Sequence, residues 1–256
     1  MNTVKEIYEK LVEIAPLELQ LEHDNSGFLI GRSDAPVEKA LLSLDLTKEV
    51  AQEAVERKAQ LIITHHPVIF DPMKSITDQT LGNEKLLCLL ENGIAVISMH
   101  TNLDFAEGGV NDVLISLLGA ANEGTFDEEG CGRKGSLEHP VPMSAFLALC
   151  REKLCSDGLR YYDAGRPVEH IAVLGGSGGS NLIGAWQAGC DTFVTADVKY
   201  SVFLKARDLG INLIDGDHFC TENPVIPAVA EKLRKAFPET EFVISERHDQ
   251  TVRFFK

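Results

Sequence analysis

The apolar positions along the chain follow two spacings, one typical of helices and one typical of buried strands. Apolar residues between Val4 and Val12 recur at intervals of three and four, which predicts an amphipathic helix over residues 3–14. Short segments of four or five residues that are rich in apolar residues predict buried strands. We expect strands at 40–44, 61–64, 94–98, 170–174, 192–195, 211–214, 241–244 and 251–255, and a short one within 22–31. Further helices are expected at 47–58, 80–91, 144–154, 198–208 and 224–237, with two more ending near residues 118 and 188.

The order of these elements indicates the fold class. Strand–helix–strand–helix occurs over residues 40–118 and again over residues 170–236, which predicts an α/β fold with largely parallel sheets. Residues 120–140 lack periodicity, so we place a change of domain there. We therefore expect two similar three-layer α/β domains. Residues 1–125 with 217–256 form domain 1, which carries most candidate ligands, and residues 126–216 form domain 2.

Composition restricts the class of protein only broadly. Apolar residues make up 44% of the chain and charged residues 25%, as in ordinary globular proteins. There is no run of about 18 apolar residues and no signal-peptide pattern, so we expect no membrane partner. The six cysteines are scattered without a Cys-x-x-Cys pair. We interpret them as reduced thiols of a cytoplasmic protein.

The formal net charge of −15 bears on possible partners. Binding to nucleic acid along a surface requires clustered Lys and Arg, so nucleic acid is not an expected partner unless such residues line a local surface. An anionic small-molecule substrate stays possible at one locally positive site. Bound metal ions could create such a site within an acidic protein.

Three predicted strand ends carry side chains that commonly bind metal ions. His65 and His66 follow the strand at 61–64, His100-x-x-x-Asp104 follows the strand at 94–98, and His218-x-x-x-Glu222 follows the strand at 211–214. The carboxyl ends of parallel strands lie along one edge of a sheet, so such groups can converge there. His218 and Glu222 share one face if their segment is helical. The same histidines could instead be packed core residues, and His100 an ordinary strand-end residue.

The ligand types indicate which metals and how many. Imidazoles with carboxylates suit Zn, Mn, Fe, Co or Ni better than Ca or Mg. Adjacent histidines diverge at a strand end, which favours two ions about 3.5–4 Å apart with a bridging carboxylate. We expect this dinuclear site at the carboxyl ends of the strands, in the cleft between the two domains.

Several other residues near strand ends allow two interpretations. The glycine-rich loop Gly175–Gly179 follows a strand and precedes a helix, so its amides could bind an anion, or the glycines could permit close packing. Asp45 and Asp197 could be N-caps or hydrogen-bond partners of ligands. We expect Cys220 to pack and not to bind metal.

Seven motifs in this order resemble one known family. They are His-Asp-Asn-Ser-Gly (23–27), Ser-Leu-Asp-Leu-Thr (43–47), Ile-Thr-His-His-Pro (63–67), His-Thr-Asn-Leu-Asp (100–104), Gly-Arg-Lys-Gly (132–135), Ala-Val-Leu-Gly-Gly-Ser-Gly-Gly (172–179) and Asp-Gly-Asp-His-Phe-x-Thr-Glu (215–222). The chain is similar to the NGG-interacting-factor-three-like proteins, widely described as GTP cyclohydrolase 1 type 2 homologues.

The resemblance implies a specific site and assembly. Two divalent ions per subunit would be bound by His65, His66, Asp104, His218 and Glu222, with Asp104 as the bridge and His100 as a neighbour. It also implies two α/β domains and a homohexameric ring, or toroid, built as a trimer of dimers. The metal sites would face the interior of this ring.

The chain departs from the family pattern at two places. Relatives often have Trp where this chain has His23. Many have Thr-Gly-Glu/Asp followed by one or two histidines where this chain has Thr195-Ala196-Asp197 and then Tyr200 and Ser201. These departures bear on the substrate more than on the metal ligands.

Two classes of function fit these observations. The first is a metal-dependent hydrolase, either opening the guanine imidazole ring of GTP with release of formate or cleaving a phosphoester. His100 and Asp197 are the candidates for proton transfer. The second is a non-enzymatic, metal-binding ring scaffold that carries metal or binds a protein or nucleic acid.

Overall fold

The computed structural model describes residues 1–255, which divide into two compact units. The first unit consists of Met1–Glu107 and Ile226–Asp249, and the second of Gly108–Val225 and Gln250–Lys256. The chain passes from one unit to the other at 107/108 and again at 225/226. The predicted domain boundaries are 125/126 and 216/217. His218 and Glu222 therefore belong to the second unit, and His65, His66 and Asp104 belong to the first. The assignment of two domains stays a prediction.

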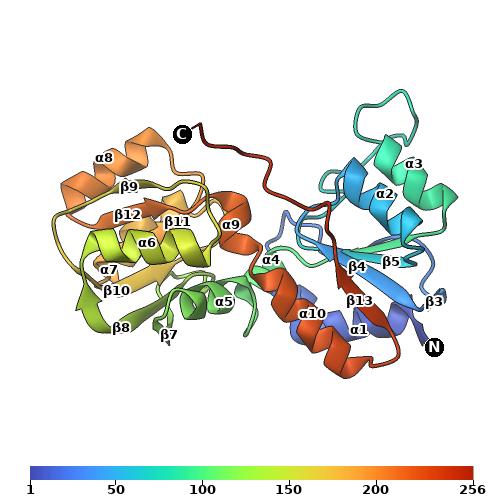
Figure 1. The fold of residues 1–256 in the computed structure, drawn as a ribbon, viewed down its shortest axis with the longest axis horizontal. Helices are drawn as coiled ribbons and strands as arrows, with labels where there is room; N and C mark the ends of the chain where they lie inside the picture. Colours follow the sequence, from blue (N-terminus) through green and yellow to red (C-terminus); the bar gives the residue numbers. More distant parts are fainter. Residues whose placement is uncertain (256) are drawn as a thin grey trace. The chain divides into compact units, whose positions relative to one another are not determined.

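The first unit contains a five-stranded sheet with mostly parallel strands (Figure 1). Its order is β13 (Glu241–Ile244), β4 (Lys39–Ser43), β5 (Leu61–Thr64), β6 (Ala95–Ser98) and β2 (Gly27–Ile30). Only the edge strand β2 runs antiparallel to its neighbour. A separate two-stranded sheet pairs β1 (Asn2–Thr3) with β3 (Pro36–Val37).

Four helices cover the two faces of this sheet. Leu41, Ile62 and Val96 pack toward α2 (Lys48–Glu56) and α3 (Glu84–Glu91). Alternate residues, such as Leu42 and Ile63, face α1 (Val4–Ile14) and α10 (Val225–Ala236), because side chains along a strand point to opposite faces. Short helices η1 (Leu17–Leu19) and α4 (Thr101–Phe105) complete the unit.

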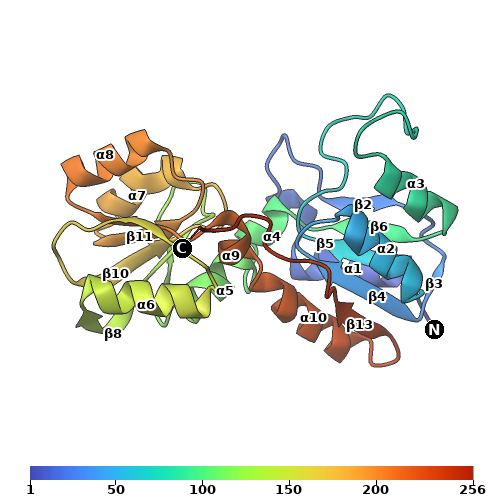
Figure 2. The same cartoon turned by 45° about the horizontal axis from the view of Figure 1, so that its top comes forward.

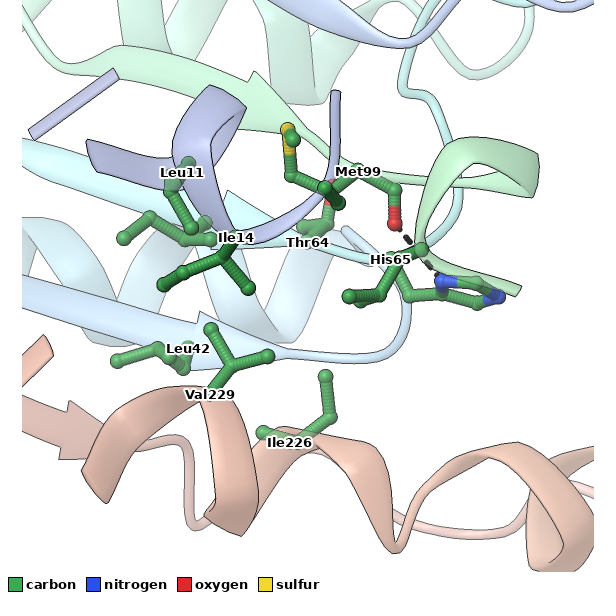
Figure 3. Close-up of a pocket in the computed structure, with 11 residues that line it drawn as sticks. Leu11, Ile14, Leu42, Thr64, His65, Met99, Ile226 and Val229 are labelled. Carbon is green, nitrogen blue, oxygen red and sulfur yellow. Dashed lines mark hydrogen bonds between the residues drawn. The ribbon is translucent and has the colours of Figure 1, made fainter. Parts of the chain in front are cut away.

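A small cavity lies between the sheet, α1 and α10 (Figure 3). Its volume is about 10 Å³, and its walls are apolar apart from Thr64 and His65. Such a space holds about one water at most. The inner side of the His65 ring is therefore packed against the core, which restricts its orientation.

The second unit contains a six-stranded mixed sheet. Its order is β7 (Ala121–Thr125), β8 (Arg133–Val141), β10 (Val168–Val173), β11 (Thr192–Thr195), β12 (Asn212–Asp215) and β9 (Arg160–Tyr162). Only two of its pairings, β10 with β11 and β11 with β12, are parallel. The prediction of largely parallel sheets is thus confirmed for the first sheet and wrong for the second.

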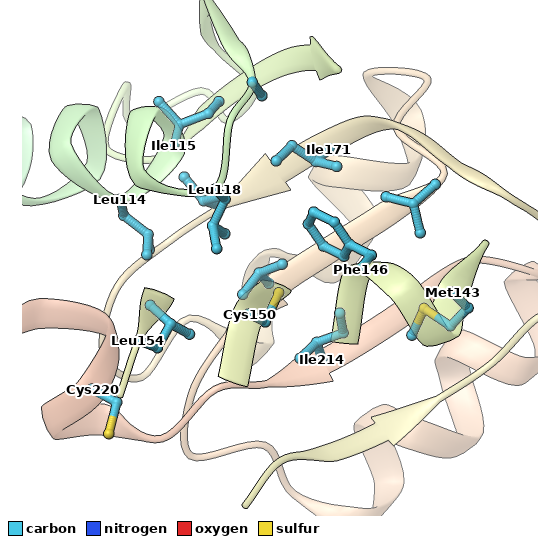
Figure 4. Close-up of a cluster of buried hydrophobic side chains, with 14 residues drawn as sticks. Leu114, Ile115, Leu118, Met143, Phe146, Cys150, Leu154, Ile171, Ile214 and Cys220 are labelled. Atoms are coloured by element: carbon cyan, nitrogen blue, oxygen red, sulfur yellow. The ribbon is translucent and has the colours of Figure 1, made fainter. Parts of the chain in front are cut away.

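Helices lie on both faces of this sheet as well. α5 (Val110–Leu117) and α6 (Met143–Lys153) pack on one face, where Phe146 contacts a cluster that includes Ile171 and Ile214 (Figure 4). α7 (Leu182–Gln187) and α8 (Tyr200–Leu209) pack on the other face against Phe193 (Figure 2). The short elements η2 (Gly179–Asn181) and α9 (His218–Glu222) precede α7 and α10. Among residues 1–255, no helix is both long and apolar enough to cross a bilayer.

Two stretches differ from the sequence analysis, one where strands were not predicted and one where a predicted strand is absent. Residues 120–140 contain β7 and β8 although they show no periodicity, because every residue of β7 is exposed and supplies no apolar alternation. Residues 251–255 form no strand. Of the apolar residues there, Phe254 packs against Gly158, while Val252 and Phe255 are exposed.

Candidate metal centre

His65 is oriented by the backbone of the neighbouring strand. Its side chain is fully buried, and Nδ1 lies 2.8 Å from the carbonyl oxygen of Met99, just after β6. A carbonyl can only accept, so Nδ1 carries a proton, and in the neutral ring Nε2 is the nitrogen that can bind a metal ion. Nε2 lies 3.6 Å from Oδ1 of Asp104. The Met99 contact thus leaves Nε2 as the nitrogen through which His65 could bind a metal ion, with the Asp104 carboxylate beside it.

His66 is oriented by a carboxylate from the end of β4. Its Nδ1 lies 2.7 Å from Oδ1 of Asp45. The amides of His65 and His66 both donate to the carbonyl of Leu44, which ties the segment after β5 to the segment after β4. A carboxylate on one ring nitrogen is the usual outer partner of a histidine that binds metal through the other nitrogen. This contact favours Asp45 as a ligand-orienting residue over an N-cap, and Thr47 caps α2 instead.

His100 is held in the same way by Asp24. Nδ1 of His100 lies 2.7 Å from Oδ1 of Asp24, whose other oxygen accepts from the amide of Thr101. Burial favours the neutral form of Asp24, but hydrogen bonds from His100 and Thr101 outweigh it and hold the pKa of this carboxyl well below its usual value. Asp24 is therefore an anion beside His100.

The first unit thus brings three imidazoles and one carboxylate together. The ring centroids of His65, His66 and His100 are 5.0–5.5 Å apart, and one nitrogen of each lies within 4.8 Å of the others. Asp104 lies on α4, four residues after His100. We call these four residues the first-unit set. Three of its members were predicted as ligands, and the structure places His100 beside them.

The second unit holds His218 and Glu222 on α9. The helix places them one turn apart, with Nε2 of His218 3.1 Å from Oε2 of Glu222. Nδ1 of His218 lies 2.8 Å from Oδ2 of Asp197. The hydrogen bond with Glu222 raises the pKa of His218 to about 9, against the opposing effect of burial and with further help from Asp197. We call His218, Glu222 and Asp197 the second-unit set.

This set can exchange a proton for a metal ion. With a carboxylate at each ring nitrogen, His218 is protonated at neutral pH. A metal ion between Nε2 and Glu222 would replace that proton, as metal binding to histidine generally does. Asp197 would keep its contact with Nδ1 in either state.

The backbone around the second-unit set is strained. Asp197 and Asp217 have φ values of +51° and +76°, which are rare for residues other than glycine. Asp217 caps α9 through the amide of Cys220. Backbone strain of this kind concentrates at functional sites.

The glycine-rich loop surrounds Glu222. A Cβ on Gly176 would lie 2.1 Å from Oε1 of Glu222. The amides of Gly175, Gly176 and Gly178 donate to the side chains of Asn111, Thr221 and Thr195. Because these amides already have acceptors within the unit, the structure favours close packing over anion binding by this loop.

Other predicted residues have simpler positions. Cys220 is buried in the apolar cluster under α6, and burial raises the pKa of its thiol to about 11, which fits a packed residue (Figure 4). Tyr200 and Ser201 are exposed in the first turn of α8.

Two supporting residues were not predicted. Asp24 lies within a recognised motif, and its carboxylate could have been proposed as a partner of a histidine. His248 accepts a hydrogen bond from the amide of Leu44 at 3.0 Å, next to the turn that carries Asp45. Burial lowers the pKa of His248. It lies in a segment without periodicity, so no pattern indicated its role.

The contact between His66 and Asp45 leads to a first prediction. Asp45→Ala should weaken divalent-metal binding by about 10- to 100-fold, the usual loss when a carboxylate behind a ligand histidine is removed. The metal affinity of Asp45→Asn should lie between those of the wild type and Asp45→Ala, because the amide oxygen of Asn can still accept from Nδ1 of His66. Competition with a chromogenic chelator measures the affinity, and exposed Asp34 provides the control Asp34→Ala. Equal affinity in Asp45→Ala and Asp34→Ala would show that Asp45 does not support a ligand.

Comparisons with known proteins agree with the motifs. Residues 2–250 match the model of the family described as Duf34/NIF3 (NGG1p interacting factor 3). A Clostridium perfringens protein named GTP cyclohydrolase 1 type 2 homolog is 34% identical, over 98% of this chain and 99% of its own. GTP cyclohydrolase 1 type 2 of Helicobacter pylori (strain J99) is 32% identical, over 91% of this chain and 92% of its own.

A solved structure confirms the fold. The Bacillus cereus protein related to NIF3 superposes with a TM-score of 0.92, covering 100% of this chain and 99% of its own, at 23% identity. At this identity the likeness concerns the fold alone. The match over residues 2–250 and the relatives above 30% identity show that the chain belongs to the Duf34/NIF3 family.

Proposed function

We propose that this protein is a dinuclear metal-dependent hydrolase. Its ligands are His65, His66 and Asp104 from the first-unit set and His218 and Glu222 from the second. The metals that suit this mixture of imidazole and carboxylate are Zn, Mn, Fe, Co and Ni. The observation that carries the proposal is the shared construction of the ligand histidines, each of which has Nδ1 against an oxygen acceptor.

This construction fits metal binding better than it fits packing. A histidine that only fills core space needs one satisfied nitrogen and has no reason to direct the other toward a carboxylate. Nε2 of His65 and Nε2 of His218 each lie within 4 Å of a carboxylate oxygen, from Asp104 and Glu222 respectively. Two ions bound by these groups would lower the pKa of a shared water and polarise the bond that it attacks.

The roles of the two proton-transfer candidates can be separated. Oδ2 of Asp197 is hydrogen-bonded to Nδ1 of His218, so we assign Asp197 the role of positioning that ligand. His100 is held at Nδ1 by the Asp24 anion, and its ring lies beside His65 and His66. We assign His100 the transfer of a proton at Nε2. Loss of Asp24 would then impair turnover without removing a ligand.

The names of the relatives suggest the substrate. GTP cyclohydrolase 1 type 2 is the name of the Helicobacter pylori relative, so we propose hydrolytic opening of the guanine imidazole ring of GTP with release of formate. Hydrolysis of a phosphoester is the alternative within the same chemical class, because dinuclear sites commonly catalyse it. Both reactions use an anionic substrate.

A second prediction distinguishes these reactions. The metal-loaded protein incubated with GTP should release formate, and phosphate release should stay at the level of the blank. Formate and phosphate are measured separately in the same samples, with His65→Ala as the inactive control. Phosphate without formate would identify a phosphohydrolase. A metal-loaded protein that releases neither product, from GTP or from a panel of phosphoesters, would contradict catalysis and favour the metal-carrier or scaffold function.

A further inference from the structure

Phe70 is an exposed aromatic residue on an anchored backbone. It follows Val68 and Ile69, both of which pack against the core formed by β5, α2 and α3. The side-chain amide of Asn25 donates to the carbonyl of Ile69 at 2.6 Å and ties this loop to the one before β2. The backbone is therefore fixed up to Phe70, yet the residue is 45% exposed.

The ring of Phe70 lies between two imidazoles. Its centroid is 6.5 Å from that of His23 and 6.2 Å from that of His100, with interplanar angles of 69° and 82°. His23 is also exposed. His100 in turn contacts His65 and His66. A continuous series of aromatic contacts thus runs, within the first unit, from exposed His23 to the fully buried ring of His65.

This arrangement costs stability if it has no ligand. Complete burial of a Phe side chain is stabilising, and a partly exposed ring forgoes some of that gain. The rings that contact Phe70 are the imidazoles of His23 and His100, and Asp24 bonds to His100, so the Phe70 ring does not extend an apolar core. Exposed aromatic rings bind other planar rings by stacking, as they do the bases of single-stranded nucleic acids.

We propose that Phe70 and His23 form a stacking platform for the planar heteroaromatic ring of the substrate, a purine, and hold it beside the imidazoles of the first-unit set. The choice of a purine rests on the proposed function, whereas the platform itself rests on the contacts of Phe70. The platform adds ring recognition to a site whose other groups recognise only charge. It also assigns a role to His23 at a position that the metal ligands do not explain.

The test is equilibrium binding to metal-free protein, where no turnover occurs. Guanosine carries the ring without phosphate, and ribose 5-phosphate carries phosphate without the ring. We expect guanosine affinity to fall about tenfold in Phe70→Ala and in Phe70→Leu, and to return to within about threefold of wild type in Phe70→Trp. His23→Ala should weaken guanosine binding less, and ribose 5-phosphate affinity should not change. Leu81→Ala, at a fully exposed apolar residue of the same loop, is the matched control.

Three results would overturn the platform. They are absence of guanosine binding by the wild type, equal affinity in all variants, and a change of oligomeric mass in Phe70→Ala with unchanged guanosine affinity. The last result would make Phe70 a subunit contact. Failure of the proposed function gives a different result. A protein that never turns over GTP can still bind guanosine more weakly when Phe70 is replaced. Conversely, turnover with an unchanged Kd and KM in Phe70→Ala removes the platform alone.

Discussion

Replacement of His65 by alanine is expected to lower divalent-metal affinity by about 100-fold or more and turnover by about 1000-fold. Removal of an oriented ligand should exceed the roughly 10- to 100-fold loss seen when only its outer partner is removed. The ring is fully buried, with the core on one side and Asp104 beside Nε2, so little water can take its place. Metal affinity is measured by chelator competition and turnover by product release.

Two controls make this result specific. His139 is mostly exposed on β8, so His139→Ala should leave both quantities unchanged. Thermal unfolding of the metal-free proteins shows whether His65→Ala still folds. A folded variant that loses metal but retains full turnover would mean that the metal is not catalytic. Unchanged metal affinity would mean that His65 is a packed core histidine after all.

Substitution of Gly176 by alanine is expected to destabilise the protein by about 3 kcal/mol, the range of severe steric substitutions. Two effects add at this position. Its φ of +64° costs a non-glycine residue about 1–2 kcal/mol. The new Cβ would also lie 2.1 Å from Oε1 of Glu222, whose carboxylate is buried and bonded to His218.

Gly210 allows the two effects to be separated. It has a similar φ of +68°, but nothing lies within 4 Å of its Cβ position. Gly210→Ala should therefore show only the backbone cost of about 1 kcal/mol. Urea unfolding gives both stabilities, and the NMR titration of His218 reports whether Glu222 has moved. Equal destabilisation in the two variants, with an unchanged His218 titration, would contradict the role of the glycine loop in seating Glu222.

The parts of the structure that the sequence predicted are those with local signals. Leu61, Ile62 and Ile63 are apolar, as expected for a strand that is buried on both faces. Pro67 cannot continue the ladder, so the position of His65 at a strand end was predictable. The four-residue spacing of His218 and Glu222 became informative because α9 is helical there. The family motifs include all five candidate ligands but not Asp197, and the comparisons confirm the family.

The parts that were missed depend on contacts between distant segments. The group that determines the tautomer of His65 is the backbone carbonyl of Met99, and no side chain in the sequence indicates this contact. β7 pairs with β8 through a close approach at Gly135, where a Cβ would lie 1.9 Å from the carbonyl of Ala121, and not through an apolar alternation. The anchoring of Phe70 by Asn25 joins residues 44 positions apart. Such contacts follow from tertiary packing, which overrides local pattern.

The central claim is that ligands from both sets bind two ions, and a count of metal per chain tests it most directly. The protein is purified without a His-tag or chelators and analysed by elemental mass spectrometry beside His65→Ala and His218→Ala, one variant from each set. The account predicts two equivalents of divalent transition metal in the wild type and fewer in each variant. A wild type without bound metal after incubation with all five candidate metals, or full metal content in both variants, would contradict it.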